Sequence, residues 1–153
     1  MPAAHELDIR VRYSESDQMG IVHHANYLVY LEEGRTALMR ALGFPYDDVE
    51  RRGFAMAVRR VEVRYRAAAR YGDEIVVRTA VEHFRGASIQ YASDIVRSSD
   101  SALLATGTVE VACLSIRDGL KPVPLPEDIR SHLERYALDL PGKAGTDIQA
   151  PRR

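Results

Sequence analysis

One segment of the chain, residues 13–35, concentrates residue types that can attack a carbonyl group. Asp17 lies in a polar turn with Gly20, two histidines follow, and Asn26 precedes an apolar run with helical spacing. The start of a helix attracts negative charge, because its first N–H groups lack partners within the helix. Asp17 is therefore a candidate nucleophile or general base, with oxyanion donors from the helix start. The alternative is that Asp17 is only a turn or capping residue.

Two further side chains near Asp17 are candidates for the same chemistry. His24 follows Asp17 by seven positions, and its backbone N–H is expected to help bind an oxyanion. The imidazole of His24 either orients water or substrate or is a satisfied polar group. Tyr13, four positions before Asp17, either borders the site or packs as a strand aromatic.

Other common chemistries lack support in the sequence. His23 and His24 are adjacent rather than spaced as i and i+4, and the remaining histidines are scattered, so no metal is expected. Cys113 occupies an apolar alternating position, which favours a core role over catalysis. The chain has no G-x-S-x-G, P-loop or G-x-G-x-x-G motif, which argues against serine hydrolases and common nucleotide-binding folds.

The distribution of charge hides an arginine-rich middle. Net charge is −1 over 153 residues, but residues 51–85 contain nine arginines, no lysine and four acidic residues. This segment is either a solvated strand face or a site for phosphates. Nucleic acid is not expected, because the chain is not strongly basic and carries no recognised binding motif.

Size and composition predict one soluble domain in the cytoplasm. The single cysteine excludes an internal disulfide, no segment is apolar enough to span a bilayer, and the N-terminus lacks the apolar core of a secretory signal. The spacing of apolar residues predicts a strand, a long helix capped by Asn26, then strands joined by short turns, and a short helix. Gly34 inside the long helix indicates close approach of a neighbouring backbone. The expected ranges are strand 7–13, helix 27–42, strands 57–66, 74–84, 88–97 and 102–116, and helix 127–136, with 141–153 disordered.

Residues 13–36, YSESDQMGIVHHANYLVYLEEGRT, resemble the signature of the hotdog-fold acyl-CoA thioesterases related to 4-hydroxybenzoyl-CoA thioesterase, including the Tol-Pal-associated group. The coarse resemblance extends to about residue 136. Glu15 and Ser16 stand where the family often has a second acid, and His23 replaces a more common aromatic residue. The matching residues are Tyr13, Asp17, Gly20, Ile21, Val22, His24, Asn26, Tyr27, Glu32 and Arg35.

The resemblance implies an α+β hotdog domain over residues 1–137, with about five antiparallel strands wrapped around one helix, and a tail at 138–153. It implies hydrolysis of an acyl-CoA, which is a substrate and not a cofactor, in a homodimer or homotetramer with active sites at the subunit interface. A hydratase or dehydratase and a non-catalytic acyl-CoA or acyl-carrier binding module are the alternatives. Glu32 and Arg35 are expected to form an ion pair. The implied catalytic residues are Asp17, His24 and Tyr13; the substrate-binding candidates are Asn26, Glu32, Arg59, Arg60, Arg64, Arg66, Arg70 and Arg85.

Overall fold

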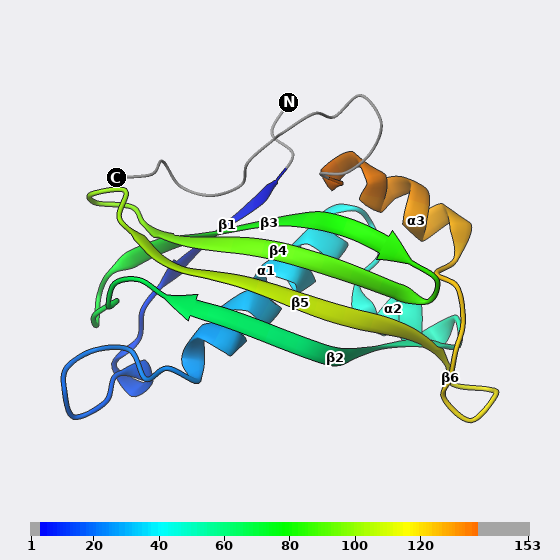
Figure 1. Ribbon diagram of the computed structural model, residues 1–153, viewed down its shortest axis with the longest axis horizontal. Helices are drawn as coiled ribbons and strands as arrows, with labels where there is room; N and C mark the ends of the chain where they lie inside the picture. The colour runs from blue at the N-terminus through cyan, green and yellow to red at the C-terminus, as the bar shows by residue number, and fades with distance from the viewer. Residues whose placement is uncertain (1–3, 138–153) are drawn as a thin grey trace.

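A computed structural model describes residues 4–137, in which a curved antiparallel sheet wraps around one long helix, α1 (Figure 1). The strand order is β1-β3-β4-β5-β2, and the short β6 pairs with β5. This arrangement confirms the expected α+β class. The strands are β1 (His5–Arg10), β2 (Phe54–Tyr65), β3 (Glu74–Arg85), β4 (Ser88–Arg97), β5 (Leu103–Ser115) and β6 (Lys121–Pro122); the helices are α1 (Asn26–Ala41), α2 (Tyr46–Arg51) and α3 (Glu127–Leu133), with 3-10 turns η1 (Tyr13–Glu15) and η2 (Glu134–Tyr136).

Two glycines allow α1 to lie close to the sheet. A Cβ at Gly34 would come within 2.7 Å of side-chain atoms of Val77 and Thr79 on β3. The expected close approach is present, but it involves side chains and not a neighbouring backbone. A Cβ at Gly107 on β5 would come within 2.7 Å of the Leu31 side chain of α1. Neither contact leaves space for a side chain, so both positions fix the depth at which the helix packs.

The edge strand β2 is only partly covered by the rest of the chain. The main contacts of α1 with the sheet are to β1 and β3, at the opposite edge. A β-bulge between Val58 and Arg60 shifts the register against β5, so that Val58 and Val61 share the helix-facing side. Val58, Val61 and Tyr65 remain 40–50% exposed there, although their types favour burial.

Several boundaries differ from the sequence expectation. The first strand ends at Arg10, and Tyr13 belongs to η1 rather than to a strand. Asn26 is not the N-cap of α1, because Ala25 occupies that position and makes no side-chain cap bond. The expected strand alternation placed Ala57 and Val61 on one face, but the bulge separates them. Helix α2 and strand β6 were not predicted, because each is too short to show a hydrophobic period.

Four further features of the chain were expected from the sequence. Cys113 is fully buried in the core, as its apolar position predicted. No helix within residues 4–137 has the length and apolar content needed to cross a membrane. Among the same residues, no cluster of three or more His, Cys, Asp or Glu side chains is arranged to hold a metal ion. The expected tail, 138–153, lies outside the described residues.

Candidate functional site

Asp17 lies at the tip of a tight turn between η1 and α1. Its backbone N–H donates to the Ile21 carbonyl at 2.8 Å, and Gly20 closes the turn with a positive φ of 78°. The Met19 N–H donates to Asp17 Oδ1 at 2.8 Å, which fixes the orientation of the carboxylate. Within residues 4–137 no donor reaches Oδ2. One carboxylate oxygen is therefore held and the other is available to a substrate.

Glu15, which was not predicted from the sequence as a site residue, stabilises this turn through several hydrogen bonds. Its carboxylate is buried and accepts hydrogen bonds from the Tyr30 hydroxyl at 3.0 Å and the Arg12 N–H at 2.8 Å. Its backbone carbonyl accepts from the His23 N–H and from Asn26 Nδ2, both at 2.9 Å. Burial, followed by the bond to Glu15, raises the pKa of Tyr30, so the phenol stays protonated as a donor. Glu15 thus ties the Asp17 turn to the first turns of α1.

A pocket of about 310 Å³ opens beside Asp17. Its walls come from three segments that are distant in sequence: the Asp17 turn, the start of α1, and the chain that leaves β2. Tyr65 of β2 donates from its hydroxyl to the His24 carbonyl at 3.0 Å, which closes one side of the pocket. The lining residues are Asp17, Met19, Ile21, Val22, His24, Tyr27, Tyr65, Arg66, Ala67 and Ala68.

His24 reaches this pocket, and its backbone N–H has no acceptor among the described residues. The next N–H groups are occupied, since Asn26 donates to the His23 carbonyl and Tyr27 to the His24 carbonyl. The expected oxyanion donors at the helix start are therefore reduced to the single free N–H of His24. The side chain of Asn26 donates to the backbone carbonyl of Glu15. Asn26 therefore stabilises the turn and does not line the pocket.

A second hollow of about 630 Å³ is also lined by Asp17. Tyr13 and Tyr71 line it and pack edge to face, with ring centroids 5.6 Å apart. Tyr13 is 78% exposed, an unusual exposure for a large aromatic ring in a monomer. The structure thus places Tyr13 and Asp17 in the lining of the same hollow, with the Tyr13 ring largely exposed.

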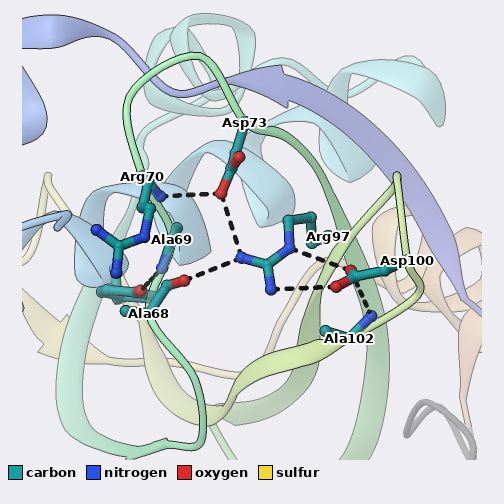
Figure 2. A network of polar contacts seen from close by, with 8 residues as sticks. Ala68, Ala69, Arg70, Asp73, Arg97, Asp100 and Ala102 are labelled. Atoms are coloured by element: carbon teal, nitrogen blue, oxygen red, sulfur yellow. Dashed lines mark hydrogen bonds and ion pairs between the residues drawn. The ribbon is translucent and has the colours of Figure 1, made fainter.

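Arg97 holds the wall formed by residues 66–73 in place (Figure 2). Its Nη1 donates to the Ala68 carbonyl at 3.0 Å and to Asp73 Oδ2 at 3.3 Å, while Nε and Nη2 form a bidentate pair with Asp100. The bonds from Arg97 are also the largest influence lowering the pKa of Asp100. Because Ala68 lines the pocket, Arg97 connects the end of β4 to the pocket wall without lining the pocket itself.

The same wall is tied to α1 through Tyr27. The Ala69 N–H donates to the Tyr27 hydroxyl oxygen at 3.1 Å, and the Ala69 carbonyl accepts from the Val22 N–H at 2.8 Å. Burial raises the pKa of Tyr27 more than the Ala69 bond lowers it, so the hydroxyl remains neutral. The Asp17 turn, α1 and the 66–73 segment therefore form one hydrogen-bonded frame.

The arginine candidates lie in three different places. Arg66 lines the Asp17 pocket, and Arg70 Nη1 lies 3.9 Å from the position of a Cβ on Gly20, in the Asp17 turn. Arg59, Arg60 and Arg64 are exposed along β2, and Arg60 and Arg64 flank Glu62 at 3.9 and 3.7 Å. Arg85 is at the β3–β4 turn, at the far end of the sheet from Asp17 (Figure 1).

The expected ion pair between Glu32 and Arg35 is absent. Within residues 4–137 Arg35 has no carboxylate oxygen within 4.0 Å, and Glu32 is exposed. Both residues instead line a separate cavity of about 280 Å³, farther along α1 than the Asp17 pocket. The spacing i, i+3 permits a pair but does not require one, because each side chain follows its own surroundings.

Comparison with known proteins gives a consistent set of relatives. Residues 11–133 match the family model of the thioesterase-like superfamily. The chain is 40% identical over 116 residues to YneP of Bacillus subtilis, covering 76% of this chain and 83% of YneP. It is 32% identical over 124 residues to the acyl-CoA thioesterase YbgC of Haemophilus influenzae, covering 80% and 89% of the two chains. The crystal structure of a DHNA-CoA thioesterase from Staphylococcus aureus superposes with a TM-score of 0.78 at 30% identity, over 87% of this chain and 88% of that one.

Proposed function

This chain belongs to the thioesterase-like superfamily and has its hotdog fold, and we propose that it hydrolyses acyl-CoA thioesters with Asp17 as the catalytic carboxylate. The observation that carries the assignment is the state of Asp17. One oxygen is held by the Met19 N–H, the other has no partner among residues 4–137, and a pocket opens beside it. A residue kept only as a turn cap would need no such pocket.

In the proposed reaction the thioester carbonyl lies in the pocket between Asp17 and His24. Asp17 Oδ2 attacks the carbonyl carbon or removes a proton from an attacking water. The His24 N–H donates to the oxygen as it becomes negative, and the positive end of the α1 dipole adds to this stabilisation. The carbon–sulfur bond then breaks, and coenzyme A leaves as a thiolate that takes up a proton. If Asp17 is the nucleophile, this step leaves an anhydride between Asp17 and the acyl group, and attack of water on its Asp17 carbonyl carbon releases the free acid and regenerates the carboxylate. If Asp17 is the base, the attacking water itself supplies the oxygen of the free acid. Multiple turnovers in ¹⁸O-labelled water separate the two roles, because only nucleophilic attack places label in the Asp17 carboxylate.

We further propose that two copies pair through their β2 edges. Within residues 4–137 β2 has a partner on one side only, and a long unpaired edge is a template for another strand. Leu28 and Val29 on α1 are 43% and 46% exposed, and they add apolar surface to the exposed residues of β2. A symmetric dimer would bury these side chains. Light scattering with size-exclusion chromatography tests this: a monomer at micromolar concentration would contradict it.

The arginines and the location of the protein complete the proposal. Arg66 and Arg70 are the arginines with the best access to the 3′- and 5′-phosphates of coenzyme A, because they flank the mouth beside Asp17. The arginines of β2 would reach the nucleotide only across a dimer. The proposed location is the cytoplasm, a reducing compartment in which the buried Cys113 stays a free thiol.

The test is the substitution Asp17→Asn, which removes the charge and preserves the size and the Oδ1 acceptor. Thiol release from hexanoyl-CoA should fall by a factor of about 10² or more, the range for loss of a positioned catalytic group. The melting temperature should not change, because the Met19 N–H keeps its acceptor. Near-wild-type turnover would refute the assignment. Hydration of an enoyl-CoA, measured in parallel, detects the competing hydratase activity.

A further inference from the structure

Arg35 is a buried cation that forms no ion pair within residues 4–137. Its exposed fraction is 9%, although arginine is among the residues that rarely enter the interior unpaired. In the described part of the chain no carboxylate lies within 4.0 Å of its guanidinium. Removing a charge from water costs several kcal/mol unless a partner compensates. An arginine kept in this state indicates that the partner comes from outside the chain.

The surroundings of Arg35 have the shape of a binding site. Its side chain lines the cavity of about 280 Å³ between α1, α2 and the first half of β2. The hydroxyl of Tyr46 lies beside the guanidinium, whose charge opposes the larger rise that burial causes in the Tyr46 pKa. Apolar side chains form the remainder of the wall. The lining residues are Glu32, Arg35, Thr36, Tyr46, Val49, Glu50, Phe54, Met56, Val58 and Val111.

We propose that this cavity binds a carboxylate attached to an apolar body, with the Arg35 guanidinium as its counter-charge and the Tyr46 hydroxyl as a second donor. The planar guanidinium matches a carboxylate through two parallel hydrogen bonds. The apolar body would contact Val49, Phe54 and Met56. This combination of apolar walls and a few convergent polar groups is typical of small-molecule sites.

The charges at the rim favour a single carboxylate over a phosphate. Glu32 and Glu50 also line the cavity, and both side chains are exposed. Two acidic groups near one arginine repel a multiply charged ligand more strongly than a singly charged one. A single carboxylate therefore suits this cavity better than the phosphates of coenzyme A. The substitution Glu32→Gln should tighten binding of a carboxylate, because it removes one of the two repulsive charges.

This inference rests in part on the proposed function, which supplies two sources of the carboxylate. One is the free acid that thioester hydrolysis releases; the other is an acyl group that carries a carboxylate of its own at the far end. Pairing of two β2 edges about a two-fold axis is antiparallel. It would therefore bring the Phe54 end of one strand, with this cavity, towards the Tyr65 end of its partner and the Asp17 pocket.

The experiment measures binding of hexanoate to the full-length protein by titration calorimetry, with hexanamide as the uncharged control. Wild type should bind hexanoate at least tenfold more tightly than hexanamide. The substitution Arg35→Met should weaken hexanoate binding roughly tenfold or more, while Arg35→Lys retains part of it. Arg40→Met, an exposed arginine on the same helix, is the matched control and should bind like wild type. Equal hexanoate affinity in wild type and Arg35→Met would overturn the proposal.

Two further readouts complete the test. Without ligand, Arg35→Met should melt at or above the wild-type temperature, because an apolar side chain replaces an unpaired buried charge; a clear fall would show that Arg35 is structural and overturn the proposal. If the kcat/KM ratio of adipoyl-CoA to hexanoyl-CoA falls in Arg35→Met, the carboxylate is that of the acyl group. An unchanged ratio with weakened hexanoate binding identifies the free acid. Calorimetry needs no turnover, so the cavity is tested even if Asp17→Asn refutes the proposed reaction.

Discussion

Replacing Arg97 by methionine tests whether the wall of the Asp17 pocket is held from a distance. Arg97 does not line the pocket, but its Nη1 donates to the carbonyl of Ala68, which does. The same guanidinium also contacts Asp73, just before β3, and Asp100, in the turn between β4 and β5. Methionine keeps the length and apolar stem of the side chain and removes every one of these bonds. We therefore expect a loss of both stability and catalytic efficiency from one change outside the pocket.

The size of the effect follows from the two partly buried contacts. Hydrogen bonds that involve a charged group contribute about 1.5–3 kcal/mol each. Arg97 and Asp73 are 20% and 24% exposed, so water can replace part of each bond. After this reduction each of the two contacts contributes about 1 kcal/mol. The loss of about 2 kcal/mol should lower the melting temperature by roughly 4–8 °C in a protein of this size. The exposed bonds to Asp100 are left out of this sum.

The assay is thermal unfolding together with kcat and KM for hexanoyl-CoA. A displaced wall misplaces the carbonyl relative to Asp17, so kcat/KM should fall by roughly tenfold at a temperature where the variant is fully folded. Arg97→Lys should recover stability better than activity, because an ammonium cannot bond the Ala68 carbonyl and Asp100 at the same time. Arg10→Met is the control, since its pair with Glu74 is exposed and should not matter measurably. Full activity in a destabilised Arg97→Met would refute the positioning role.

Two further predictions concern the fold that carries the site. Gly34→Ala should lower stability by about 1–2 kcal/mol, because overpacking against Val77 and Thr79 outweighs the gain of about 1 kcal/mol in helix propensity. An unchanged or higher melting temperature would contradict the close packing of α1 on β3 at this position. Burial lowers the pKa of His5 below its usual 6.5, because it disfavours the protonated imidazole in the folded state. Stability is therefore greatest above pH 6.5 and decreases as pH falls through the lower folded-state pKa. His5→Gln should weaken this dependence of the unfolding free energy on pH below pH 6.5, and an unchanged slope would exclude His5 as its cause.

The sequence by itself determined the features that depend on local pattern. Period-two alternation located the long strands to within a few residues, and helical spacing located α1. Gly34 indicated a close contact between α1 and the sheet, because a glycine inside a helix lowers its stability unless packing requires it. The segment around Asp17 pointed to thioester chemistry through its resemblance to a family, and the comparisons with known proteins support the same family.

Only the tertiary structure decided what surrounds each of these residues. Glu15, Arg97 and Arg35 are charged residues of a kind usually left in solvent. Glu15 and Arg35 lie within the family signature, but nothing in the sequence indicates that either is buried or that Arg97 supports the pocket wall. Their roles arise from burial and from partners as distant as residues 68 and 97. The bulge in β2 likewise depends on pairing with β5. Spacing along a chain restricts which side chains can meet, but the free energy of a charge depends on what the fold places around it.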